Sequence, residues 1–106
     1  MVRYRRKYVA GGTYCFAVAL RNRRARLLVA HIERLRAAFR EVRQANPFEI
    51  VAIVILPEHL HAILTLADGD ADYSTRWKRI KGGFTARLRQ AGTALAKDRR
   101  GEYGLW

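Results

Sequence analysis

The segment FEIVAIVILPEHLHAILTL, residues 48–66, predicts an antiparallel β-hairpin near the middle of the chain. Its first part, residues 48–56, is almost entirely apolar, as is typical of a central strand that is buried on both faces. The turn residues Pro57-Glu58 follow, so residues 59–66 are expected to return as the neighbouring strand. In that strand, leucines and an alanine occupy one face and the two histidines occupy the other. The hairpin therefore offers one face for packing and one face for chemistry.

The residues on either side of the hairpin have the periodicities of one further strand and two helices. Residues 13–20 alternate bulky with small apolar side chains, which predicts a strand. Apolar residues recur at helical spacing over residues 27–44 and predict a helix with a basic outer face, which Asn46-Pro47 ends. A second helix is expected to begin near residues 72–74, whose aspartate or serine can cap it. Its apolar stripe consists of Tyr73, Trp77, Ile80, Phe84 and Leu88.

The order of these elements is strand, helix, strand, strand, helix, which is a ferredoxin-like split β-α-β arrangement without its last strand. We therefore expect an α+β fold, with an antiparallel sheet and two helices on one of its faces. One incomplete domain should cover residues 1–106, with a basic arm over residues 1–12 and an irregular segment over residues 91–106. Because the missing fourth strand would pair beside residues 13–20, that strand should keep a bare apolar edge. A homodimer or aggregation through this edge is expected unless the C-terminal segment folds over it.

Composition argues against secreted and membrane-spanning classes. The chain has 106 residues and a mass of 12.2 kDa, enough for one hydrophobic core. No apolar run reaches the ~20 residues that span a bilayer, and no signal-peptide core follows the basic N-terminus. The single cysteine, Cys15, cannot form an internal disulfide, so a reducing cytoplasm is the expected compartment. Cys15 itself is expected to be an inert core residue.

Charge is the strongest signal of a partner. The chain carries 21 basic and 9 acidic residues, a formal net charge of +12, and its pI is near 11.1. Such a balance makes nucleic acid the expected partner. The candidate phosphate contacts are Arg3, Arg5, Arg6 and Lys7 in the arm and Arg76, Lys78, Arg79 and Lys81 in the second helix. The alternative for both groups is ordinary solvation, as a free tail and as the polar face of an amphipathic helix.

The histidine pair is the sharpest local candidate for a site. Side chains two apart on a strand share a face and lie about 6–7 Å apart, so His59 and His61 could reach one metal ion. The alternative is a pair of partly exposed histidines on an ordinary hairpin. No third ligand is evident, because His31 is expected at the surface of the first helix and Glu58 is expected to point across the turn.

Longer stretches of the sequence resemble a known family. The run VILPEHLH, residues 54–61, followed by GDADYSTRWKRIK, residues 69–81, resembles the REP-associated tyrosine transposases, which belong to the HUH class of single-strand DNA transposases. The other matching segments are YRR at 4–6, GGTY at 11–14 and NPFEI at 46–50. Together the matches extend the resemblance over residues 3–106.

The resemblance implies an HUH-type fold and a metal-assisted reaction. In the family, the histidines that correspond to His59 and His61 bind a divalent metal, Mg²⁺ or Mn²⁺, which polarises the scissile phosphate. A tyrosine on a later helix attacks the phosphorus and forms a 5′-phosphotyrosine link to single-stranded DNA, and a polar side chain of that helix completes the metal site. The resemblance thus implies cleavage and joining of single-stranded DNA at the hairpins of palindromic repeats in the nucleoid, with the basic arm and helix holding the hairpin.

The sequence departs from the family pattern at its C-terminal end. The family's nucleophile follows the segment that corresponds to residues 101–106, so a truncated transposase is expected. Tyr73 corresponds to an aromatic core residue and Tyr103 to a variable loop position, so neither is assigned as nucleophile and no catalytic residue is identified. Two histidines alone should hold a metal weakly. The rival interpretation is a non-catalytic DNA-binding remnant that regulates repeat hairpins. An RNA-binding module is disfavoured, because residues 59–66 lack stacking aromatics.

Overall fold

The computed structural model describes residues 2–4, 12–22, 24–67, 69–95 and 104–106, with side chains from residue 12 onward. The predicted arm residues Arg5, Arg6 and Lys7 lie outside the described residues, as do residues 96–103 of the segment expected to be irregular. The elements in chain order are β1 Val2–Tyr4, β2 Thr13–Ala19, α1 Leu27–Ala30, α2 Ile32–Ala45, β3 Phe48–Ile55, β4 His59–Leu66 and α3 Tyr73–Gln90.

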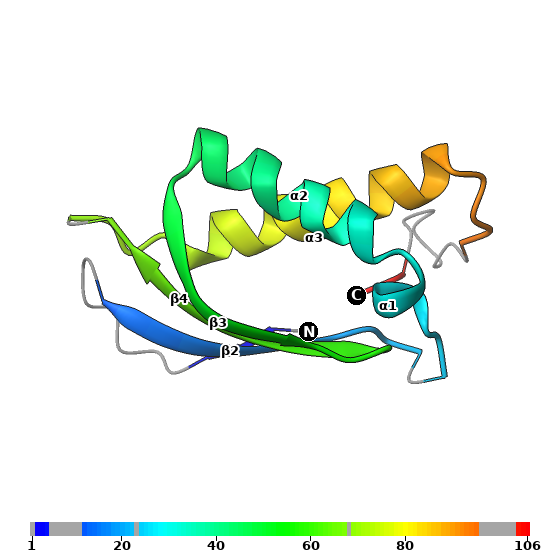
Figure 1. Cartoon of the computed structure of the whole chain (residues 1–106), viewed down its shortest axis with the longest axis horizontal. Coiled ribbons are helices and arrows are strands. Elements are labelled where there is room, and N and C mark those ends of the chain that lie inside the picture. The colour runs from blue at the N-terminus through cyan, green and yellow to red at the C-terminus, as the bar shows by residue number, and fades with distance from the viewer. Residues whose placement is uncertain (1, 5–11, 23, 68, 96–103) are drawn as a thin grey trace.

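The four strands form one antiparallel sheet in the order β1-β2-β4-β3, and α2 and α3 lie together on one of its faces (Figure 1). This arrangement confirms the predicted α+β fold with both helices on the same side. The predicted hairpin is present, because β3 pairs with β4 around the turn at Pro57. No helix in the described part of the chain is long and apolar enough to cross a membrane.

The core lies between the sheet and the two long helices. Alternate residues of β2 and β4 point into it and meet the predicted stripe of α3, all five members of which are buried. Aromatic rings make many of these contacts: the centroids of Phe16 and Trp77 are 5.4 Å apart, and those of Phe16 and Tyr73 are 4.9 Å apart. At Gly83 the helices α2 and α3 are close together, since a Cβ there would be in van der Waals contact with the Ala38 side chain at 3.5 Å. The amphipathic patterns therefore correctly predicted which faces pack.

The first helix is interrupted, in contrast to the continuous helix expected over residues 27–44. His31 separates α1 from α2 with a backbone φ of −119° and ψ of 38°, outside the helical region. The short α1 lies against the hairpin turn, where the Leu28 backbone N–H donates to the Pro57 carbonyl over 3.1 Å. The break thus buries Leu28 beneath the turn while α2 follows the sheet. The start of α3 is as predicted, since the Asp72 carboxylate accepts a hydrogen bond from the Thr75 backbone at 3.1 Å.

Strand β3 is an edge strand, so the prediction of a central strand buried on both faces is wrong. Its neighbour on one side is β4, and no strand in the described part of the chain pairs with its other side. Val51 and Val54 are 59% and 57% exposed. Aliphatic β-branched residues favour a strand wherever it lies in the sheet, so an apolar run could not distinguish an edge from a centre.

The bare edge expected along residues 13–20 is also corrected. Strand β1 pairs with β2, with Val2 opposite Val18 and Tyr4 opposite Phe16, so β2 is an inner strand. At the end of β2, the Arg21 backbone N–H donates to the carbonyl of Leu105 over 3.0 Å. Unpaired backbone N–H and C=O groups at a strand edge can hydrogen-bond to any strand of suitable register. Here residues 2–4 of the same chain provide that strand. The reason for expecting a homodimer through this edge is therefore lost at the positions that β1 covers.

Candidate metal and nucleic-acid site

The two histidines project from the sheet face opposite the helices. Along β4, Leu60 and Ala62 are buried beneath α2 and α3, while His61 between them is exposed and His59 is partly exposed. The centroids of the two imidazole rings are 5.2 Å apart and the rings are nearly perpendicular, at 87°. The strand period thus places both rings on one face, close enough to serve one ion.

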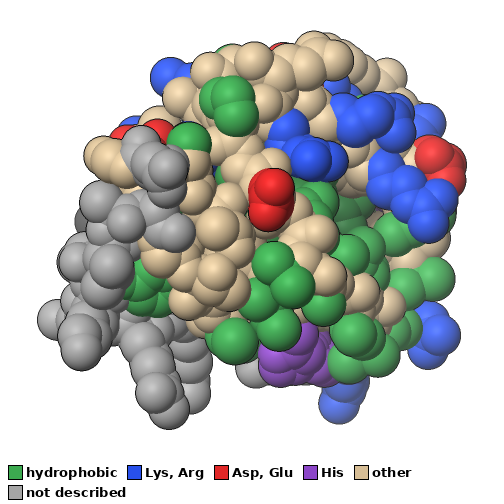
Figure 2. Space-filling view, turned by 60° about the vertical axis from the view of Figure 1, so that its left-hand side comes forward, with side chains coloured by type: hydrophobic (Ala, Val, Ile, Leu, Met, Phe, Trp, Pro, Cys, Tyr) green, Lys and Arg blue, Asp and Glu red, His purple; other side chains and the backbone are tan. Residues whose placement is uncertain are grey.

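Small and apolar residues surround the pair. On β2, Ala17 lies opposite His61 and Ala19 lies opposite His59, while Val54 of β3 lies on the other side of His61. Figure 2 shows histidine side chains beside hydrophobic side chains at the lower edge of the view, with a Lys or Arg side chain just below them. Because the flanking alanines are short, a phosphate group could approach the rings from solvent.

Glu58 orients His59, which corrects the expectation that this side chain points across the turn. The Glu58 Oε1 atom lies 2.9 Å from Nδ1 of His59, and both side chains are about three-quarters buried. A carboxylate can only accept, so Nδ1–H donates and the Nε2 lone pair of His59 is left for a metal or a phosphate-bound proton. The direction of a side chain within a turn is set by the tertiary fold, so no sequence period could have shown this contact.

The donor set fits a divalent ion in part. Two imidazole nitrogens on one face are suitable ligands, and Glu58 accepts a hydrogen bond from Nδ1–H of His59. No group of three or more His, Cys, Asp or Glu side chains that could hold a metal occurs among the described residues. His31 is not part of the set, because it lies at the junction of α1 and α2 with Nδ1 3.2 Å from the Arg34 guanidinium.

Cys15 belongs to the open face of the sheet and not to the core. The residue is exposed, and it lies opposite Ile63, two positions from the Ala17–His61 pair. Its neighbours Tyr14 and Phe16 fill the core instead. The prediction of an inert core cysteine is therefore wrong, because the small face of residues 13–20 is the uncovered one.

Two tyrosines with described side chains are structural. Tyr14 and Tyr73 are both buried on the helix side, with ring centroids 4.8 Å apart. The Tyr73 hydroxyl donates to the Gly12 carbonyl, and burial raises the pKa of this phenol above its ordinary value of 10.0. Neither hydroxyl reaches the histidine face, which agrees with the assignment of Tyr73 as a core aromatic. Tyr103 lies outside the described residues.

Arg76, a predicted DNA contact, is instead buried, with an exposure of 3%. Its guanidinium pairs with both carboxylate oxygens of Asp70, at 2.8 and 3.3 Å. It also donates to the carbonyls of Asn46 at 3.2 Å, Pro47 at 3.0 Å and Asp72 at 3.0 Å. Arg76 therefore joins the start of α3 to the link between α2 and β3 and has no donor directed to solvent. Its position in a basic run hid this role from sequence analysis.

The remaining basic candidates of α3 divide into two kinds. Lys78 and Arg79 are exposed, and Arg79 donates to the side-chain carbonyl of Asn46. Lys81 is partly buried, with Nζ 5.9 Å from the Trp106 ring centroid, and burial lowers the pKa of its ammonium group. These helix residues lie on the layer opposite the histidine face, so the structure does not bring them to the pair.

Strand β1 brings the predicted arm residue Arg3 into register with the histidines. Arg3 lies opposite Ala17, which in turn lies opposite His61 on β4. The backbone of Arg3 is thus two strands away, about 10 Å at the usual strand spacing. Among the described basic residues that were predicted to contact DNA, Arg3 alone occupies a strand position in register with the histidine pair.

Comparisons with known proteins show the family of the chain. The family model described as "Transposase IS200 like" matches residues 4–106. A REP-associated tyrosine transposase of Escherichia coli K12 is 53% identical over 85 residues, 80% of this chain and 52% of that protein. A curated relative from Haemophilus influenzae is 35% identical over 108 residues, 100% of this chain and 61% of the relative. The chain thus spans between half and two thirds of the length of these relatives.

Two solved structures are similar to this fold. A REP-associated tyrosine transposase bound to a REP hairpin superposes with a TM-score of 0.78 at 50% identity, over 84% of this chain and 54% of that one. A crystal structure from Deinococcus radiodurans superposes with a TM-score of 0.61 at 25% identity, over 84% of this chain and 68% of that one. The sheet and the helices therefore have the architecture of a solved transposase.

Proposed function

The chain belongs to the IS200-like transposase family, and on that premise we propose that it binds single-stranded DNA at REP-type hairpins and presents one backbone phosphate to the histidine face. The observation that carries this proposal is the pairing of His59 and His61 on an open face whose neighbours are short. The 50% identical transposase was solved bound to a REP hairpin, which supports the same class of DNA for this chain.

His59 and His61 would hold a divalent ion, Mg²⁺ or Mn²⁺, as two of its ligands. When bound, such an ion supplies Lewis-acid polarisation of a phosphate oxygen. The role of Glu58 is to accept a hydrogen bond from Nδ1–H of His59, which keeps the proton on Nδ1 and leaves the Nε2 lone pair free for the ion. Water or a further donor would complete the coordination, since two imidazoles leave positions open, and the ion is expected to be weakly held.

The basic residues are proposed to contact different parts of the DNA. The proposal assigns to Arg3, whose backbone position on β1 is in register with the pair, a contact with the DNA strand that crosses the sheet. Lys78 and Arg79 lie on the helix layer, from which they would neutralise phosphates of the hairpin stem and not of the reacting strand. Arg76 takes no part in binding because its donors are used within the protein.

The enzymatic alternative requires a nucleophile. Family resemblance implies a tyrosine hydroxyl that attacks the phosphorus, so that an O–P bond forms as the bond to the departing 3′ oxygen breaks. Tyr14 and Tyr73 are unsuited to this role because both are buried away from the histidines. We therefore propose that the described residues supply the DNA binding and phosphate activation of a transposase reaction. The second candidate function is a non-catalytic, regulatory role in which the protein only binds the DNA.

The test uses an end-labelled single-stranded DNA hairpin with and without Mn²⁺. We expect a salt-sensitive shift on a native gel that Mn²⁺ strengthens in the unaltered protein. His59→Ala and His61→Ala should bind the hairpin but lose the Mn²⁺ effect, and His31→Ala, in the helix layer, should keep it. An equal Mn²⁺ effect in all four proteins would overturn the metal assignment. A covalent adduct on a denaturing protein gel would select the enzymatic candidate, and its absence would select the binding role.

A further inference from the structure

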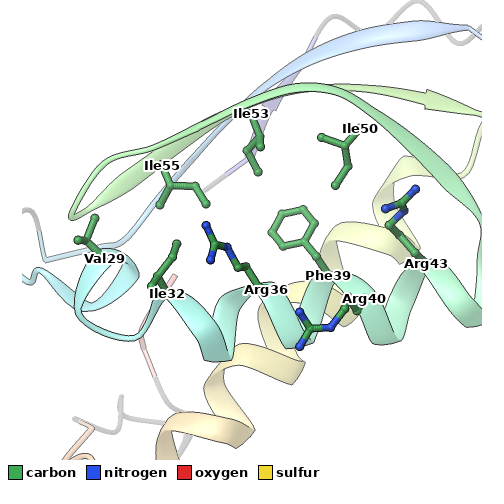
Figure 3. A pocket seen from close by; sticks show the side chains of 9 residues that line it. All are labelled: Val29, Ile32, Arg36, Phe39, Arg40, Arg43, Ile50, Ile53 and Ile55. Carbon is green, nitrogen blue, oxygen red and sulfur yellow. The ribbon is translucent and has the colours of Figure 1, made fainter.

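A groove separates the edge strand β3 from helix α2 on the helix side of the sheet (Figure 3). Its volume is about 560 Å³. It is lined by Val29, Ile32, Arg36, Phe39, Arg40, Arg43, Ile50, Ile53 and Ile55. The groove lies on the layer opposite the histidine pair, so its occupant would not compete for the histidine face.

The floor of the groove is aliphatic and continues to an unpaired strand edge. Ile50, Ile53 and Ile55 point from β3 toward α2 and are only partly buried (Figure 3). Val29, at one end, is 46% exposed. Beyond this floor, no strand in the described ranges pairs with the outer edge of β3. An open row of backbone donors and acceptors beside an apolar trough is the geometry to which an added strand binds.

The rim of the groove is positive. Arg36, Arg40 and Arg43 are exposed and follow one another along α2 at helical spacing, and no acidic residue lines the groove. Arg36 pairs with Glu33 at 2.7 Å, but both side chains are mostly exposed, so the pair can be exchanged at little cost. Arg40 makes no ion pair with any residue that the structure describes.

We propose that this groove is a docking site for an extended acidic peptide that adds as a strand to the edge of β3. Alternate side chains of such a strand would face α2, where aliphatic residues would contact Ile53 and Phe39 and carboxylates would meet the arginine rim. The backbone of the peptide would satisfy the outer edge of β3.

Two other occupants fit less well. A second copy of the chain would bring a net charge of +12 to a positive rim, and its own β3 offers only Glu49 as an acid. A single strand of nucleic acid would need stacking surfaces, whereas Phe39 is the only aromatic residue in the lining and is 5% exposed. The phosphates of a duplex could meet the arginine rim, but they would leave the aliphatic floor and the edge of β3 uncovered. Charge and shape together therefore favour a peptide.

The probe is a fluorescein-labelled peptide of about ten residues, in which threonine alternates with valine and glutamate, so that valine and glutamate share one face. A matched peptide carries lysine in place of glutamate. Fluorescence anisotropy at about 0.15 M salt should show binding of the glutamate peptide and not of the lysine peptide. The variant Arg36→Glu/Arg40→Glu should lose at least tenfold in affinity for the first and gain affinity for the second.

Controls separate the groove from general attraction to a basic protein. Arg24→Glu/Arg34→Glu makes the same change in net charge outside the groove lining and should keep the affinity. If a strand is added, N-methylation of the alternate amides that face β3 should abolish binding, whereas N-methylation of the other set, which faces solvent, should be tolerated. Equal loss in both double variants, or binding that survives N-methylation whichever of the two sets carries it, would overturn the proposal. Displacement of the peptide by a second copy or by a DNA hairpin, with the same dependence on Arg40, would assign the groove to that occupant instead.

Discussion

The two faces of strand β4 differ completely although their residues alternate along one short segment. Leu60 and Leu64 are fully buried beneath the helices, where side chains from several elements surround them. His59 and His61 point to the other side, beside alanines and a valine, where His61 is exposed and His59 is partly exposed. The covered face holds the fold together and the open face does not. Substitutions on the two faces should therefore separate stability from ligand binding.

The largest expected effect comes from the covered face. Leu64→Ala should lower the free energy of unfolding by about 2–5 kcal/mol, because it leaves a cavity in the core. His61→Ala, on the open face of the same strand, should change it by no more than about 0.5 kcal/mol. Urea unfolding followed by circular dichroism measures both. Similar losses in the two variants would show that the open face is not spared a structural role.

A comparable contrast exists between two basic residues of α3. Arg76→Ala should destabilise the fold by about 2–3 kcal/mol, because the carbonyls of Asn46, Pro47 and Asp72 lose their donor. Lys78→Ala serves as the control, since its side chain is exposed, and should leave stability unchanged. Thermal unfolding of both variants tests the contrast. A stable Arg76→Ala protein with weakened DNA binding would restore the interpretation of Arg76 as a DNA contact.

On the open face, the contact between Glu58 and His59 should affect only the affinity for a metal ion. Glu58→Gln should weaken Mn²⁺ binding about tenfold, because an amide is a poorer acceptor for Nδ1–H than a carboxylate. Glu49→Gln removes the same charge from β3 and should have no such effect. Mn²⁺ titration followed by electron paramagnetic resonance gives both affinities. If the two variants weaken binding equally, Glu58 acts only through its charge.

Low pH should destabilise the fold through two carboxylates at the start of α3, Asp70 and Asp72. Hydrogen bonds from Arg76 and from Thr75 hold the pKa values of Asp70 and Asp72 below their ordinary value of 3.8. Groups with lowered pKa values stabilise the fold fully above pH 3.8, and this contribution is lost as the pH falls through the lowered values. The double variant Asp70→Asn/Asp72→Asn should be less stable at neutral pH and lose less stability between about pH 5 and pH 2. An unchanged acid limb in unfolding measurements would argue against these two carboxylates as its source.

The smallest expected effect concerns the salt dependence of binding to the DNA hairpin. Lys78→Ala should reduce the slope of log affinity against log salt concentration by about 1, the contribution of one phosphate contact. Arg76→Ala, measured under conditions where it remains folded, should leave the slope unchanged because its donors face inward. Hairpin titrations at several salt concentrations provide both slopes. No change for Lys78→Ala would place the stem elsewhere than on this part of α3.

Local periodicity was enough to predict most elements and the faces that they bury. The stripe of α3, the cap at Asp72 and the shared face of His59 and His61 all depend on residues a few positions apart, so the pattern contains them. Sequence analysis failed for Arg76, whose partners come from the link between α2 and β3, far away in the chain. It also failed for Glu58, because turn side chains have no period.

The sequence by itself determined the element types, the hydrophobic faces and the net positive charge of this protein, because helical and strand periods and formal charge are local properties of the chain. Only the tertiary structure decided that β3 is an edge strand, that β1 occupies the edge of β2, and that Arg76 is buried while Lys78 is not. Neighbour order in a sheet depends on backbone pairing between distant segments, and backbone hydrogen bonds carry no side-chain signature. The groove beside β3 follows from that order, so it too became visible only in the folded molecule.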